Sequence, residues 1–180
     1  LEGLAHHKGS AFGGLGEEKQ PSPEMFENLL ALKLHALPEG QPVWLEDESR
    51  RIGDINMPLA LWNTMRRSVV YFLDIPFEER LNYITQEYGK YKQEDLVNAT
   101  IRIQKRLGGL NAKNAINYLL EKNYKECFRI LLAYYDKFYK QSLHNREELD
   151  QLLTVVPCET VDAKTNARKL LSLSYGEVVN

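Results

Sequence analysis

The sequence has few cysteines and no strong excess of either charge. Cys127 and Cys158 are far apart in a chain of 180 residues, and neither belongs to a CxxC pair. We therefore expect two reduced thiols in or near the core rather than a disulfide framework. The formal net charge of −2 excludes a polybasic protein. Any surface that binds nucleic acid would have to be a local patch.

Long apolar runs are missing too. No stretch approaches the length of a membrane span, and the N-terminus has no signal-peptide pattern. We expect a soluble, cytoplasmic protein without a membrane partner. The phosphate-binding motif GxxxxGK[ST] is also absent. Because the chain begins LEGL without an initiator methionine, we expect a piece of a longer protein.

Three apolar runs predict strands, at residues 42–47, 69–74 and 152–156. Helical patterns lie between them and predict helices from Ser22 to about Leu37, over 56–67, from 76 onward, and over 91–107, 112–121, 124–139 and 161–173. This alternation predicts an α/β fold with a parallel sheet. We divide the chain into part of an α/β core (1–90), a basic helical subdomain (91–145) and a final strand and helix (146–180). The helical subdomain would be an insert or lid.

The most informative stretch is residues 42–53, which read PVWLEDESRRIG. Carboxylates that follow a strand would lie at the carboxyl edge of a sheet, where open α/β folds bind ligands. Carboxylates there commonly hold Mg²⁺, and adjacent arginines suit phosphate groups. A turn whose charges are merely solvated explains the pattern equally well.

Two other regions could bind anions. In the glycine-rich loop that begins HHKGS at residue 6, a lysine, a serine and backbone amides could cradle a phosphate, although a flexible surface loop is an equal alternative. A basic, tyrosine-rich region covers residues 90–140, and cations interleaved with aromatic rings are typical of RNA recognition. The alternative is that the tyrosines form a helical core and the lysines are solvated.

Five segments of the chain form a distinctive set: residues 1–13 (LEGLAHHKGSAFG), 46–53 (EDESRRIG), 76–80 (PFEER), 106–109 (RLGG) and 134–136 (YYD). Together and in this order they resemble bacterial tRNA 2-selenouridine synthases. The resemblance implies a P-loop NTPase-like parallel sheet, here truncated at its N-terminus. It also implies a rhodanese-like domain with a catalytic cysteine. Such enzymes act on 2-thiouridine at the tRNA wobble position, using geranyl diphosphate for S-geranylation and then selenophosphate as the selenium donor.

The resemblance assigns no catalytic residue to this chain, because neither cysteine matches the motif and the P-loop is missing. It implies substrate phosphate contacts at His7, Lys8, Ser10, Phe12, Asp47, Glu48, Arg50, Arg51 and Arg106, with Asp47 as a possible Mg²⁺ ligand. For tRNA we expect Lys90, Lys92, Arg102, Lys105 and Lys113. The chain alone would be inactive, and an exposed sheet edge predicts self-association. Two alternatives stay open: an ATP-binding phosphotransferase fragment and a non-catalytic RNA-binding module.

Overall fold

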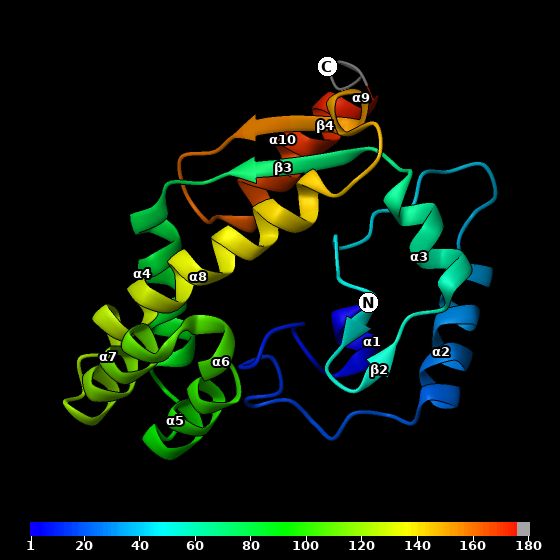
Figure 1. Ribbon diagram of the computed structural model, residues 1–180. Coiled ribbons are helices and arrows are strands. Elements are labelled where there is room, and N and C mark those ends of the chain that lie inside the picture. The colour runs from blue at the N-terminus through cyan, green and yellow to red at the C-terminus, as the bar shows by residue number, and fades with distance from the viewer. Residues whose placement is uncertain (176–180) are drawn as a thin grey trace.

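The computed structural model describes residues 1–175, and one of the two sheets in this range consists of two parallel strands (Figure 1). β3 (Val70–Asp74) pairs with β4 (Leu153–Pro157) in a register that runs from Val70 opposite Leu153 to Asp74 opposite Pro157. Parallel strands need a long crossover, and the chain between these two strands is helical. The α/β fold and the predicted strands at 69–74 and 152–156 are confirmed.

Helices make up most of the rest. They are α1 (Glu2–Ala5), α2 (Pro23–His35), α3 (Leu59–Arg66), α4 (Phe77–Tyr88), α5 (Gln93–Arg102), α6 (Gln104–Leu107), α7 (Gly109–Leu120), α8 (Tyr124–His144), α9 (Leu149–Leu152) and α10 (Ala163–Tyr175). The predicted start at Ser22 is confirmed, since its Oγ accepts a hydrogen bond from the Met25 amide at 3.2 Å. None of the described helices is long and apolar enough to span a membrane.

The predicted strand at 42–47 is wrong. Residues 42–49 form no regular element, and two short antiparallel strands follow, β1 (Arg51–Ile52) and β2 (Ile55–Asn56). A strand needs a neighbouring backbone for its amides and carbonyls, and no part of the described chain pairs with 42–49. The apolar side chains of this segment are also partly in solvent, with Val43 47% and Trp44 41% exposed.

The described residues pack into two hydrophobic cores. The larger lies among α4, α5, α7 and α8 and includes Leu81, Leu96, Ala115, Leu119, Cys127, Phe128 and Leu131. The smaller joins α1, α2 and the β1–β2 hairpin through Ala5, Phe26, Leu30, Ile52, Ile55 and Met57. Both cysteines are buried and free, as predicted, and burial raises the pKa of Cys127 to about 12.

α8 connects the parts of the fold that matter for function. It runs from the group of helices α4–α7 to the region beneath β3 (Figure 1). Its Tyr135 hydroxyl accepts a hydrogen bond from the Ala11 amide at 3.1 Å, and its Tyr139 ring stacks on Phe72 of β3 at 5.9 Å. The 42–49 segment also meets this helix, because the Tyr139 hydroxyl donates a hydrogen bond to Asp47. The loop, this segment and the sheet therefore all contact α8.

Candidate functional site

The glycine-rich loop at residues 6–16 is organised by His7. Its Nδ1 accepts a hydrogen bond from the Gly9 amide at 3.1 Å. A Cβ added to Gly13 would lie 2.9 Å from the His7 ring, so the loop closes tightly around the imidazole. Burial lowers the pKa of His7, which favours the neutral ring that this acceptor role requires.

The central part of the loop, residues 8–13, does not offer free amides to an anion. The amides of residues 8–13 all donate within the protein, to the Gly13 carbonyl, His7 Nδ1, the Lys8 carbonyl, Tyr135 Oη, Ser10 Oγ and the Ser10 carbonyl in turn. The expected backbone cradle for a phosphate is therefore not formed in this arrangement. An anion at the loop would have to break bonds that the loop already makes.

Glu48 is the acidic residue that reaches this loop. A Cβ added to Gly9 would lie 2.5 Å from Glu48 Oε2, so the carboxyl group rests directly on the glycine. Burial, followed by the nearby Glu2 and Glu46, raises the pKa of Glu48 to about 7. The structure thus brings together two stretches, HHKGS and EDE, that are about forty residues apart in the chain.

Replacing Gly9 with alanine tests this contact. Gly9 has a φ of 69°, a left-handed conformation that alanine adopts only with strain. We expect Gly9→Ala to lower the free energy of unfolding by about 1–2 kcal/mol and to displace the Glu48 carboxyl group. Urea denaturation measures the loss. Gly14→Ala is the matched control, because Gly14 lacks a positive φ and its added Cβ would meet His7 at 3.4 Å. Equal losses of stability in Gly9→Ala and Gly14→Ala would contradict the contact between Glu48 and Gly9.

The other residues expected to bind phosphate do not come together at one site. Lys8 pairs with Glu17 at 3.4 Å. Phe12 is 4% exposed, and its ring packs against Tyr88 and Phe128, so the structure places it in the core rather than at a ligand surface. Arg51 closes the β1–β2 turn, with its Nε donating to the Gly53 carbonyl at 2.8 Å and its Nη2 to Asp54 at 2.8 Å.

Two further residues of the predicted phosphate set are Ser10 and Arg50. Ser10 Oγ accepts a hydrogen bond from the Phe12 amide within the loop. Arg50 is exposed, and its backbone carbonyl accepts a hydrogen bond from the Met57 amide. The residues expected to contact tRNA are all exposed, between α4 and α5 and on α5–α7: Lys90, Lys92, Arg102, Lys105 and Lys113. Their roles remain predictions.

Asp47 points away from the loop toward the end of α8. Its Oδ1 accepts a hydrogen bond from Arg146 Nη2 at 2.7 Å, and its Oδ2 accepts one from the Tyr139 hydroxyl at 3.3 Å. Both oxygens therefore bond to protein donors, and one donor is a cation. This set does not fit a Mg²⁺ ion, which needs free carboxylate oxygens. No group of three or more potential metal ligands occurs among the described residues.

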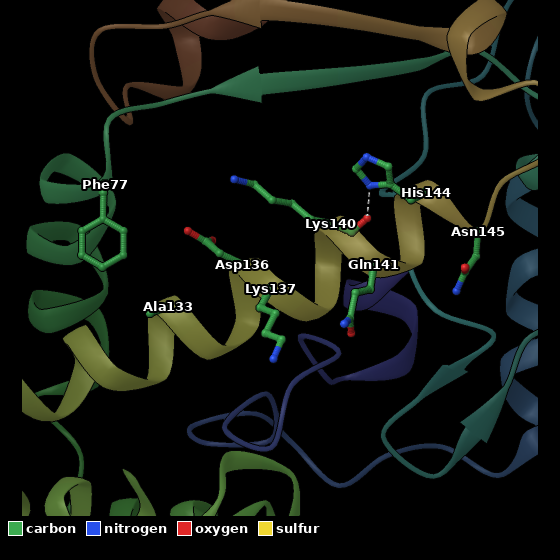
Figure 2. A pocket seen from close by; sticks show the side chains of 8 residues that line it. All are labelled: Phe77, Ala133, Asp136, Lys137, Lys140, Gln141, His144 and Asn145. Carbon is green, nitrogen blue, oxygen red and sulfur yellow. Dashed lines mark hydrogen bonds between the residues drawn. The ribbon is translucent and has the colours of Figure 1, made fainter.

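Two adjoining cavities lie along α8. The larger, of about 820 Å³, is lined by Phe77, Ala133, Asp136, Lys137, Lys140, Gln141, His144 and Asn145 (Figure 2). The smaller, of about 520 Å³, shares Ala133, Lys137 and Gln141 with it and adds Arg106, Leu107, Asn111, Arg129, Ile130, Tyr134 and Phe138. We call the two together the α8 cavity.

Free cations dominate the charge of the α8 cavity. Arg129 is paired with Glu78 and Glu126, and Asp136 is neutralised by Arg80. Lys137 and Lys140 make no ion pair with any residue from 1 to 175, and Figure 2 shows their side chains on different sides of α8. Both lysines belong to the basic, tyrosine-rich region predicted at residues 90–140, although neither was among the residues predicted to contact phosphate or tRNA.

Comparison with known proteins identifies the family. The profile described as tRNA 2-selenouridine synthase AAA domain matches residues 1–154. The chain belongs to this family. Among curated tRNA 2-selenouridine synthases, that of Shewanella frigidimarina is 31% identical over 179 aligned positions, which cover 82% of this chain and 49% of that protein. The Shewanella piezotolerans protein is 33% identical with the same coverage, and the Nitrosomonas europaea protein is 40% identical over 91 positions, covering 49% of this chain and 23% of that protein.

The chain spans about half the length of the first two relatives. No solved structure matches it. Membership of the tRNA 2-selenouridine synthase family agrees with the resemblance drawn from the segments at residues 1–13, 46–53 and 76–80, all of which lie inside the matched range. The α/β fold with a parallel strand pair is consistent with an AAA-type domain.

Proposed function

We propose that this chain is the part of a tRNA 2-selenouridine synthase that binds the phosphate groups of its substrates and of tRNA. The full enzyme would convert wobble 2-thiouridine to 2-selenouridine by S-geranylation, with geranyl diphosphate and selenophosphate as the small substrates. The catalytic cysteine would belong to a rhodanese-like domain, and no residue of this chain is given that role. The α8 cavity is the observation that carries the proposal.

The chemistry of the α8 cavity supports phosphate and RNA binding. Arg106, Lys137 and Lys140 supply positive charge, and guanidinium and ammonium groups are the usual partners of phosphate. Tyr134 and Phe138, with ring centroids 4.7 Å apart, supply aromatic faces on which an unstacked base can lie. Because the amides of residues 8–13 are already bonded, these side chains are better placed for the phosphate role than that part of the loop.

Removing two of these cations tests the proposal. We expect the Arg106→Ala, Lys137→Ala double variant to weaken tRNA binding by about tenfold or more at low salt. The slope of log K against log salt should become shallower by about 1.5, because roughly two phosphate contacts are lost. Fluorescence anisotropy with labelled tRNA over a salt series measures both quantities.

Lys33→Ala is the matched control. Lys33 is an exposed cation on α2, which lies on the opposite side of the molecule from α6 and α7 (Figure 1). Its removal should change neither affinity nor slope by more than a small amount. A loss in Lys33→Ala as large as in the double variant would indicate general charge attraction. Unchanged binding in the double variant would remove the α8 cavity from the tRNA surface.

A further inference from the structure

A buried arginine just beyond the end of α8 lacks hydrogen-bond acceptors for part of its guanidinium group. Arg146 has a side chain with no accessible surface, and only its Nη2 finds an acceptor, Asp47 Oδ1. Its Nε and Nη1 are buried without a hydrogen-bond partner in the described part of the chain. A buried guanidinium group needs a carboxylate partner, because removing the carboxylate leaves an uncompensated buried charge that destabilises the fold.

A second cation increases that dependence. Arg66 of α3 donates from Nη2 to the Ser142 carbonyl at 3.1 Å, close enough to Arg146 for their charges to repel. The pKa of Arg66 is lowered by burial and then by Arg146, with Asp47 acting in the opposite direction. Two guanidinium groups therefore share the negative charge of Asp47. This surplus of positive charge opposes the binding of a further cation at the same carboxylate.

We propose that Asp47 and Arg146 form a positioning pair that fastens the 42–49 segment to the end of α8. On this assignment Asp47 serves as the counter-ion of Arg146, and metal binding is not its role. Tyr139 completes the attachment by donating to the second oxygen of Asp47. Glu48, the next residue, is thereby directed to the loop at Gly9. The pair would hold the segment in place whatever ligand the α8 cavity takes.

A double-mutant cycle tests the pair in the full chain. Asp47→Asn should lower the folding equilibrium constant by at least about 30-fold, since it leaves Arg146 buried beside Arg66. Arg146→Met should cost less, because it removes the buried charge itself. The double variant Asp47→Asn, Arg146→Met should recover most of the loss caused by Asp47→Asn. Urea denaturation gives all three constants, and additive losses would overturn the proposal.

The exposed pair of Arg51 and Asp54, with side chains 65% and 89% accessible, is the matched control for the cycle. The coupling between its two substitutions should be small, so that their losses of stability are nearly additive. If Asp47→Asn does not fold, recovery of folding in the double variant supports the pair, and failure of both variants to fold overturns it.

Two further measurements distinguish positioning from a general loss of stability. Glu48 faces Glu2 of α1, its neighbour Glu46 and the loop at Gly9. In Arg146→Met the NMR titration midpoint of Glu48, assigned with Glu48→Gln, should move toward that of an exposed glutamate, whereas Arg146→Lys should keep most of its native value. Titration with MgCl₂ alone in a calorimeter should give the same heat of binding for the wild type and for Asp47→Asn. Loss of a Mg²⁺ signal in Asp47→Asn with unchanged stability would identify Asp47 as a metal ligand and overturn the proposal.

Discussion

Replacing Arg80 with alanine should lower the free energy of unfolding by about 2–3 kcal/mol. Arg80 of α4 makes a bidentate pair with Asp136 of α8, with Nη1–Oδ1 and Nη2–Oδ2 distances of 2.6 and 2.9 Å. Its Nε also donates to the Ile75 carbonyl at 3.0 Å, and the guanidinium lies over the Phe77 ring at 5.7 Å. Since the two side chains are 30% and 28% exposed, the cost should fall below that of a fully buried pair.

The measurement is urea denaturation of Arg80→Ala beside two other variants. Arg80→Lys keeps the charge but loses the planar fork, so it should recover less than half of the loss. Lys90→Ala is the control, because Lys90 makes a 3.5 Å pair with Glu87 at side-chain exposures of 56% and 38%. That pair should be worth less than about 0.5 kcal/mol. Similar losses in Arg80→Ala and Lys90→Ala would contradict a special role for the fork.

The same variant should affect ligand binding. Asp136 lines the α8 cavity, and Arg80 neutralises it there. Arg80→Ala would leave a bare carboxylate beside Lys137 and Lys140, which should weaken the binding of tRNA or of a diphosphate. Adding Asp136→Asn should restore affinity without restoring stability, since it removes the charge but not the packing defect. Affinity that stays low in the double variant would show that the fork acts through the fold alone.

The pairing of Arg80 with Asp136 is a contact that the sequence alone could not predict. Both residues belong to segments, PFEER and YYD, that resemble the family, so their importance could be predicted. Their contact could not, because they are 56 positions apart and lie on separate helices. Helix start signals such as Ser22 were read correctly because a cap is a local hydrogen bond. Contacts between distant residues depend on how the helices pack, and the local pattern of a single sequence does not predict that packing.

The 42–49 segment shows a different limit. Its apolar run favours a strand, but a strand also needs a hydrogen-bonded neighbour, which local composition cannot supply. Without one, the described backbone stays irregular and its acidic residues diverge. Asp47 turns to Arg146, and Glu48 turns to Gly9. The sequence predicted a ligand site at this acidic stretch, and that role stays a prediction. It could not predict that adjacent carboxylates take separate partners.

Glu48 should make stability depend on pH in a direction opposite to that of a salt-bridged acid. Its pKa rises from 4.5 in the unfolded chain to about 7 in the folded protein, first through burial and then through Glu2 and Glu46. The folded state therefore holds the proton more tightly. The stability is fully present below pH 4.5, decreases as the pH rises to about 7, and stays constant above that.

Glu48→Gln should remove this dependence, because the amide stays neutral at every pH. We expect the variant to match the wild type near pH 4.5 and to be more stable at pH 8 by about 1–2 kcal/mol, a value that allows for solvent screening of a partly exposed group. Urea denaturation at half-unit steps of pH measures the difference. Glu39→Gln, at an exposed position, is the control and should give a curve parallel to the wild type. A parallel curve for Glu48→Gln as well would show that the carboxyl group does not bury its charge against the Gly9 loop.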